Sequence, residues 1–314
     1  MPVGTRALPD ERGRIVWAVV WMVGAIVSFT AMAVAGRAAA RGVDALQIAV
    51  WRTFVGFSIL IVIVLARGIP FGSLVSRRPG LQIARNFIHF TAQFCWLYAL
   101  TRMTLAELTT LEFTAPLWVA LLAPLLLGER LTALRLGAVV IGFIGVLIVV
   151  RPGLITLSAG TPFGLSAALG YALSMVMTKR LLRGDNAFTI LFWMQGLQVL
   201  IGLAIVFAGA LAGYGDGLVI PDAATFAWIT VVGVLGLTAH YALAKAFTYG
   251  DTVIVAPMDF LRLPLIAVVG VLLYAEPLDV WVLGGGIVVI LANLLNIRGE
   301  RQRTASTLYV KPGR

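Results

Sequence analysis

The chain has 314 residues, of which 60% are hydrophobic and only 12% are charged. Soluble domains are typically about 45 to 50% apolar and about 25% charged. A mean hydropathy of +0.98 cannot be hidden in a core of this size without leaving large apolar patches in water. These values exclude an ordinary soluble protein and predict an all-α integral membrane protein in a lipid bilayer.

The net charge is +10, and a basic balance can indicate either nucleic acid or anionic lipid. Lys and Arg lie between apolar runs and in the C-terminal tail, without a stripe of interleaved aromatic residues. We therefore expect no nucleic-acid partner. The single cysteine, Cys95, lies inside an apolar run, which excludes an intrachain disulfide and a metal site built on several cysteines.

A helix that crosses the hydrocarbon layer needs about 20 apolar residues, and ten segments approximate this length. They are 15–35, 46–66, 81–101, 104–127, 133–150, 162–182, 187–212, 224–247, 252–275 and 279–297. The first follows two arginines, as a signal peptide would, but its apolar stretch is longer than the usual hydrophobic region of such a peptide. We expect ten retained transmembrane helices joined by short turns.

Basic residues in short loops concentrate on the cytoplasmic side. With a cytoplasmic N-terminus, 17 of the 24 Lys and Arg residues lie inside, four lie outside and three lie within spans. This distribution predicts an N-in, C-in topology. Residues 1–14 would form a cytoplasmic N-terminus, and residues 298–314 a basic cytoplasmic tail.

The two halves of the sequence match each other. Sliding the chain along itself until Glu112 falls on Asp259 also places Phe113 on Phe260 and Glu129 on Glu276. A slightly smaller shift places Arg37 on Lys179 and Trp51 on Trp193. Each copy holds five spans, an odd number, so the second copy must insert upside down. Inverted repeats form a midplane site between the halves and exchange access by rocking, which predicts a transporter of a small molecule.

Several motifs of soluble chemistry are missing from the sequence. It contains no G-x-x-x-x-G-K-[ST] phosphate loop, no H-E-x-x-H metal motif and no G-x-S-x-G nucleophile elbow. Neither histidine has an acid or a cysteine placed for a metal cluster. We expect no catalytic residues, no metal and no cofactor.

Ionisable side chains inside a bilayer are costly and mark candidate sites. Arg52 and Glu112 both lie roughly 10 to 12 Å below the outer face, at about 1.5 Å of rise per residue. Their similar depth predicts a pair, which could either lock two helices together or bind substrate. Asp259 and Arg262 are three residues apart, so they can bridge on one helix face. They form either a gating element bent by nearby prolines or a self-satisfied pair.

Segment 81–101 carries Arg85, His89, Gln93 and Trp96 on one helical face. Such a polar stripe cannot face lipid, so it lines a cavity or meets another helix. Arg85 lies only about four residues inside and could instead extend to the interface. Tyr171 and Tyr241 would add aromatic faces to a cavity suited to small zwitterions or aromatic molecules.

Segments 133–150 and 279–297 carry small residues, including Gly142, Gly145 and 284–286, all glycines. Small residues let helices approach closely. These two segments would form a scaffold or a dimer face, so the protein would be a monomer or a homodimer.

The motifs of residues 85 to 153 resemble an EamA repeat of the drug/metabolite transporter superfamily. They are the run 96–100 (WLYAL), 113–116 (FTAP), 127–130 (LGER), 142–146 (GFIGV) and 151–153 (RPG), and residues 241–243, 260–264 and 275–278 form a looser second copy. The resemblance implies two EamA repeats, 15–153 and 154–297, with ten helices in two inverted halves around a central cavity. It also implies transport without ATP across the inner membrane of a bacterial-type cell. Compact proton-coupled relatives use a Glu in their first helix, and segment 15–35 has no acid.

Members of this superfamily include amino-acid exporters and carriers of nucleosides, S-adenosylmethionine and riboflavin. We expect amino-acid export: a substrate carboxylate would meet Arg52 or Arg262, and an ammonium group Glu112 or Asp259. Uptake of S-adenosylmethionine, a nucleoside or riboflavin is the alternative. A membrane enzyme or assembly subunit is the rival class, but an enzyme needs converging groups near one interface, whereas these charges lie near mid-depth.

Overall fold

A computed structural model describes residues 11–127, 132–152, 158–249 and 258–309. The regular structure of these residues is helical, as the composition predicted. The elements are α1 (Glu11–Ala39), α2 (Ala45–Ala66), η1 (Phe71–Leu74), α3 (Pro79–Leu100), α4 (Leu105–Glu112), α5 (Ala115–Leu127), α6 (Ala133–Val150), α7 (Thr161–Leu181), α8 (Ala187–Leu211), α9 (Ala223–Tyr249), η2 (Asp259–Leu261), α11 (Arg262–Tyr274) and α12 (Val280–Tyr309).

Seven segments of these helices are long and apolar enough to cross a membrane. They lie in α1, α2, α6, α8, α9 and α12, and in the continuous stretch Leu105–Leu122 that includes α4 and the start of α5. Helices α3 and α7 are too polar for this group, and α11 has 13 residues. All three overlap segments that the sequence predicted to span the bilayer.

Equivalent helices of the two halves begin with equivalent caps. The Asp44 side chain accepts a 2.9 Å hydrogen bond from the Gln47 N–H at the start of α2. The Asn186 side chain accepts a 2.8 Å bond from the Thr189 N–H at the start of α8. Each cap satisfies a backbone donor that the helix leaves unpaired. Asp44 and Asn186 align in the same register that places Trp51 on Trp193, so the repeat extends to local structure.

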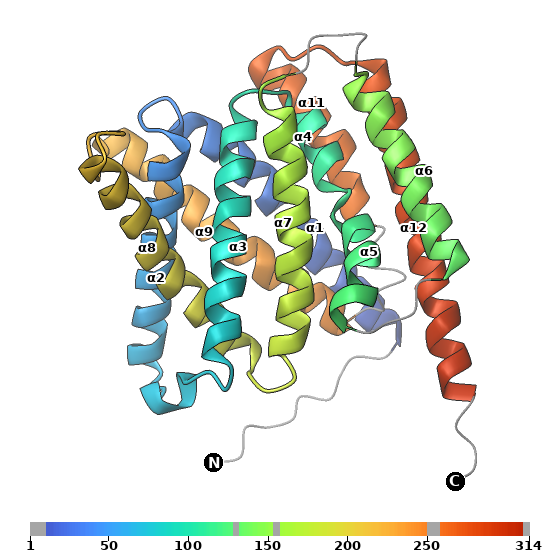
Figure 1. The fold of residues 1–314 in the computed structure, drawn as a ribbon, viewed down its shortest axis with the longest axis horizontal. Coiled ribbons are helices and arrows are strands. Elements are labelled where there is room, and N and C mark those ends of the chain that lie inside the picture. Colours follow the sequence, from blue (N-terminus) through green and yellow to red (C-terminus); the bar gives the residue numbers. More distant parts are fainter. Residues whose placement is uncertain (1–10, 128–131, 153–157, 250–257, 310–314) are drawn as a thin grey trace.

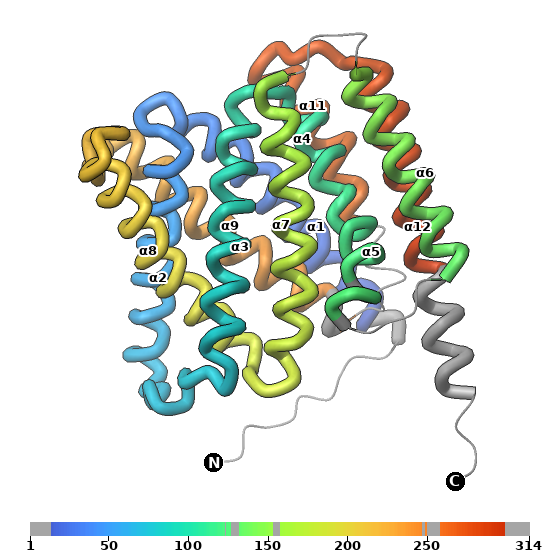
Figure 2. Tube along the Cα trace, in the orientation of Figure 1, coloured from blue at the N-terminus to red at the C-terminus, as the bar shows by residue number. Residues whose placement is uncertain are grey.

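The helices of the two halves interleave (Figure 1). Helix α1 packs along α9, and α3 packs along α7. Helices α2 and α8 lie together at one edge of the molecule, and α6 and α12 lie together at the other (Figure 2). The first helix of each half therefore packs against the third helix of the other, a reciprocal pattern of contacts.

The apolar interior lies between these interleaved helices. Its largest cluster of buried side chains includes Phe90, Leu97 and Leu100 of α3 with Leu105 and Leu111 of α4. Packing at this density fixes the relative positions of the helices. The interior cluster thus forms a rigid frame around the polar residues of α3 and α4.

Glycines allow α6 and α12 to pack closely. A Cβ atom built at Gly145 would lie 2.9 Å from the Gly285 carbonyl oxygen, and one at Gly285 would lie 2.6 Å from the Gly145 oxygen. A side chain on either residue would therefore push the helices apart. The sequence predicted that the small residues of these segments allow close approach of helices, and the structure shows that α6 and α12 approach each other there.

Candidate functional site

Two helical segments carry acidic residues in the interior. Helix α4 ends at Glu112, and α5 begins only after Phe113 and Thr114. The Asn293 side chain of α12 donates a 2.7 Å bond to the Phe113 carbonyl, which satisfies an acceptor at this break. At the equivalent position of the second half, Asp259 lies in the 3₁₀ turn that leads into α11.

Arg262 joins the two carboxylates. Its Nη1 lies 3.2 Å from Glu112 Oε1, and its Nη2 lies 3.3 Å from Asp259 Oδ2. The predicted Asp259–Arg262 bridge is confirmed. The predicted Arg52–Glu112 pair is wrong, because Glu112 pairs with Arg262; equal depth fixes the level of two residues but not the direction in which each faces. Pro257 lies outside the described residues, and Pro264 lies in the first turn of α11.

Aromatic rings enclose this ion cluster. The Arg262 guanidinium lies 5.1 Å from the ring centre of Phe29 and 5.0 Å from that of Phe113. Phe113 also meets Phe260, its repeat equivalent, edge to face at 5.2 Å. The Trp96 Nε1 donates a 3.4 Å bond to Glu112 Oε2. The nearby ring faces favour the cation.

Repeat-equivalent residues therefore meet in this cluster. Glu112 and Asp259 share Arg262, and Phe113 contacts Phe260. Residues that a two-fold operation exchanges come into contact only near the axis of that operation. The cluster consequently lies where the two halves meet.

The polar stripe of α3 faces other helices. Arg85 donates to Thr178 of α7 at 3.1 Å, so it turns inward and does not extend to the interface. His89 Nδ1 lies 2.9 Å from Gln198 Nε2 of α8. Gln93 is 1% exposed, and its buried Nε2 has no hydrogen-bond partner among the described residues. Of the four residues in the stripe, only Trp96 contacts the ion cluster directly.

Arg52 of α2 stands apart from the carboxylates. Its buried Nε has no hydrogen-bond partner within the described chain, and the ion pairs found there do not include it. Its side chain approaches α9, where a Cβ atom built at Gly236 would lie 3.0 Å from Nη2. Among the described residues, Arg52 is therefore a cation in the interior without a carboxylate partner.

The two tyrosines of the predicted site lie in different places. The Tyr171 ring lies 5.4 Å from that of His89, and Tyr171 interacts electrostatically with Arg52 and Glu112. Tyr241 is 57% exposed and packs edge to face on Trp21 at 5.8 Å. Its ring contacts Trp21 and Lys245, so a role for Tyr241 in the site stays a prediction.

Three residues of the site were not predicted from the sequence. Phe29 and Phe113 lie near the Arg262 guanidinium, and Gln198 meets His89. Aromatic and amide side chains are ordinary in apolar helices, so their type carries no signal. The repeat held one usable signal, since Phe113 and Phe260 are equivalent.

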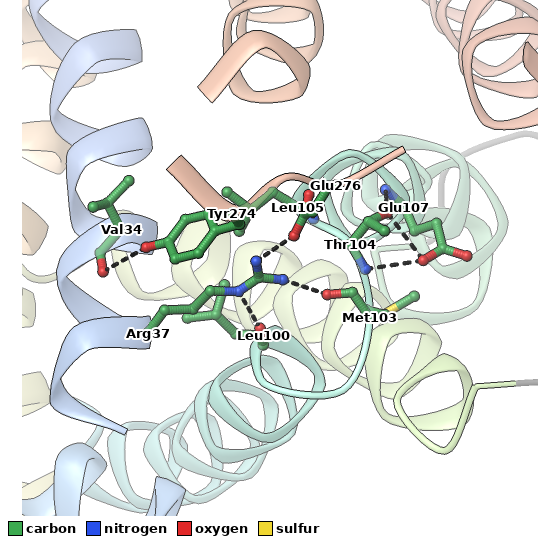
Figure 3. A network of polar contacts seen from close by, with 9 residues as sticks. All are labelled: Val34, Arg37, Leu100, Met103, Thr104, Leu105, Glu107, Tyr274 and Glu276. Atoms are coloured by element: carbon green, nitrogen blue, oxygen red, sulfur yellow. Dashed lines mark hydrogen bonds and ion pairs between the residues drawn. The ribbon is translucent and has the colours of Figure 1, made fainter. Parts of the chain in front are cut away.

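An ion pair lies within a network of polar contacts near the end of α1 (Figure 3). Arg37, near the end of α1, pairs with Glu276 between α11 and α12. Its Nε donates to the Leu100 carbonyl at 2.7 Å, and its Nη2 donates to the Met103 carbonyl. Glu276 also accepts a 2.9 Å bond from the Leu105 N–H. We call Arg37 and Glu276 the clamp, because it ties first-half helices to the end of α11. An open groove of about 620 Å³ lies beside it.

Asp185 ties the loops at the other end. Its carboxylate accepts hydrogen bonds from Ser76, from the Arg77 N–H at 2.8 Å and from Gln82 at 3.2 Å. Burial opposes ionisation of this carboxyl group, but these hydrogen bonds outweigh burial and lower its pKa below the ordinary value. The loop after α2 is thus fixed to the loop after α7.

The EamA-like transporter family matches residues 16–151 and again residues 158–298. The chain belongs to this family. Like other EamA proteins of the drug/metabolite transporter superfamily, it is a small-molecule transporter and not an enzyme. It is a multi-pass protein of the bacterial inner membrane.

EamA relatives with named substrates cover almost the whole chain. The riboflavin transporter of Brucella anthropi is 28% identical over 89% of this chain and 98% of that protein. The S-adenosylmethionine uptake transporter of Rickettsia felis is 24% identical, covering 90% and 92%. The pseudopaline exporter of Pseudomonas aeruginosa is 22% identical, covering 84% and 90%.

A solved crystal structure shares the EamA architecture seen here. It superposes with a TM-score of 0.61 at 16% identity, covering 91% of this chain and 98% of the other. At this identity the likeness concerns the fold alone.

Proposed function

We propose that this protein is a secondary transporter that exports amino acids by alternating access between two inverted repeats. The observation that carries the proposal is the meeting of Glu112 and Asp259, equivalent positions of the repeat, at Arg262. Charged groups at the interface of two repeats form a site that either half can open.

The proposed topology has ten transmembrane helices with both termini in the cytoplasm. To the seven apolar spans it adds α3, α7 and the segment that ends in α11. The polar residues of α3 face α7, α8 and α4, so they need no contact with lipid. Reciprocal packing of α1 on α9 and of α3 on α7 supports inverted halves, with repeats at 15–153 and 154–297.

The proposed site combines cations, carboxylates and aromatic faces, which are the contacts a zwitterionic amino acid needs. It consists of Arg52, His89, Gln93, Trp96, Glu112, Tyr171, Asp259 and Arg262. Glu112 and Asp259 keep 21% and 27% of their side chains exposed, although α4 is packed among other helices. That exposure supports a solvent-sized space beside the carboxylates.

The clamp supports a closed state at one end. Arg37 and Glu276 are 14% and 12% exposed, and their bonds cross from the first half of the chain to the second. Under the proposed topology this end faces outward. Release of the clamp would separate α1 from α11 and open the path to the site.

A second candidate is transport of a larger metabolite such as riboflavin, S-adenosylmethionine or a nucleoside. It is favoured by the names of the relatives from Brucella anthropi and Rickettsia felis. The rings of Phe29, Phe113 and Trp96 could also flank a planar heterocycle.

Counterflow into liposomes that contain the purified protein tests the proposal. The panel holds labelled amino acids, nucleosides, riboflavin and S-adenosylmethionine, with and without a pH gradient. We expect saturable exchange of one or more amino acids. Exchange only of riboflavin, a nucleoside or S-adenosylmethionine would support a transport function but contradict amino-acid export. No exchange of any compound in the panel would contradict both candidates.

A further inference from the structure

The two interior arginines of the site differ in charge balance. Arg262 contacts two carboxylates, Glu112 and Asp259, and lies 5.1 Å and 5.0 Å from the ring centres of Phe29 and Phe113. One guanidinium facing two carboxylates leaves a net negative charge when all three are ionised. A further anion is therefore disfavoured at Arg262.

The positive charge of Arg52 is not balanced by a described carboxylate. Its guanidinium makes no ion pair with a described carboxylate, and its buried Nε is unpaired. A charge inside a membrane protein without a counterion is expensive. A cation kept there in spite of that cost is suited to bind an anion that arrives with the substrate.

We infer that Arg52 is the subsite for a carboxylate group of the transported molecule. This inference rests on the proposed transport function and narrows it to substrates that carry a carboxylate. A guanidinium presents N–H donors in a planar fork that matches the two oxygens of a carboxylate. One guanidinium also balances one carboxylate, whereas a phosphate dianion would leave a negative charge uncompensated. The excess negative charge at Glu112 and Asp259 then receives the cationic part of the same molecule.

Gly236 sets the position of the Arg52 guanidinium. A methyl group at this position would lie 3.0 Å from Arg52 Nη2, closer than ordinary contact. The guanidinium is the end of a flexible side chain, so it can move away while the fold stays intact. Gly236→Ala therefore displaces the proposed subsite without removing its charge.

Equilibrium binding to the purified full chain in nanodiscs tests the subsite. The ligands are the amino acids of the counterflow panel, their methyl esters and riboflavin. We expect Arg52→Gln to weaken binding of the free acid by about ten- to a hundredfold and to leave binding of the ester, which lacks the negative charge, within about twofold. Arg52→Lys keeps the positive charge but not the planar fork of donors, so its affinity for the free acid should lie between those of the wild type and Arg52→Gln. Gly236→Ala should weaken binding of the acid several times more than binding of the ester. This second variant keeps the test valid even if Arg52→Gln does not fold.

The possible failures are distinguishable. If a folded variant loses the same affinity for the acid as for the ester, or loses affinity for neither, the proposed subsite is wrong. Transport of riboflavin by the wild type without binding of any carboxylate would also overturn it and leave the transporter standing. A wild type that neither binds nor transports any ligand of the panel would overturn both.

Discussion

The ion cluster shows which residue contacts a membrane sequence reveals. The Asp259–Arg262 bridge is local, so its spacing of three residues along one helix face was sufficient to predict it. The partner of Glu112 is 150 residues away, and depth alone pointed to Arg52. Depth along a helix leaves rotation about its axis undetermined. The repeat held the missing information, since Glu112 and Asp259 are equivalent and meet at the same cation.

Asp185 gives the clearest pH dependence at the level of a single residue. Its pKa is lower in the folded protein, so its contribution to stability is fully present above the ordinary carboxyl pKa of about 4 and declines as the pH falls through the folded value. We expect Asp185→Asn to destabilise the protein by about 1–3 kcal/mol at pH 7. Melting curves of both proteins in detergent should converge in acid. A melting difference that stays constant from pH 7 to pH 3 would contradict the proposed hydrogen bonds.

Helix α4 differs from the continuous span expected of it. Segment 104–127 was predicted as one helix, yet it divides after Glu112. Pro116 explains the position of the division, because it has no N–H to donate to the Glu112 carbonyl four residues earlier. Asn293 of α12 then donates to the Phe113 carbonyl. The lengths and order of the helices follow from apolar runs, and a proline indicates where one can divide, whereas a distant amide that satisfies the break cannot be read from the sequence.

The clamp predicts a change of access at one end of the bundle. Glu276→Gln removes its negative charge and leaves Arg37 bound only to carbonyl groups, so opening of this end should become easier. In a Cys95→Ser background, a cysteine at Ala106, which lines a small pocket together with Glu276, should react several times faster with an impermeant thiol reagent. Asp279→Asn is the matched control, because it removes the Arg151–Asp279 ion pair at the closely packed ends of α6 and α12. Equal labelling in both variants would rule out a gating role.

The α6–α12 contact predicts a sharp difference between neighbouring glycines. A Cβ at Gly285 meets Val149 at 2.5 Å and the Gly145 carbonyl at 2.6 Å, whereas one at Gly284 meets nothing within 4 Å. Gly285→Val should therefore destabilise the folded protein by about 1–3 kcal/mol through overpacking. This loss should lower both the yield of folded protein and its melting temperature. Gly284→Ala should change neither. If both variants behave alike, these helices do not rely on close packing.

At the scale of the whole molecule, the composition and the repeat identified the architecture before any contact was known. Equivalent caps at Asp44 and Asn186, and contact between Phe113 and Phe260, follow the same repeat. Interleaving of the halves could not be read from the sequence, because helix order does not specify which faces meet. The substrate is equally hidden, since it depends on a few side chains within a widely shared fold.

The proposed topology predicts sidedness of labelling in whole cells. In a Cys95→Ser background, a cysteine at Asp216, between α8 and α9, should react with an impermeant thiol reagent added outside. A cysteine at Arg183, between α7 and α8, should react only after the membrane is permeabilised, because positive loops stay in the cytoplasm. The reverse pattern would invert the orientation and place the clamp on the inner face.

Counterflow by Glu112→Gln tests whether the ion cluster is the substrate site. The amide retains an acceptor for Trp96 and the shape of the side chain but removes the charge that Arg262 and a substrate ammonium share. We expect exchange per folded molecule to fall by about tenfold or more, with a melting temperature close to that of the wild type. Trp96→Phe, which keeps a ring and loses the N–H, should have the smaller effect. Unchanged exchange by folded Glu112→Gln would show that substrate passes elsewhere.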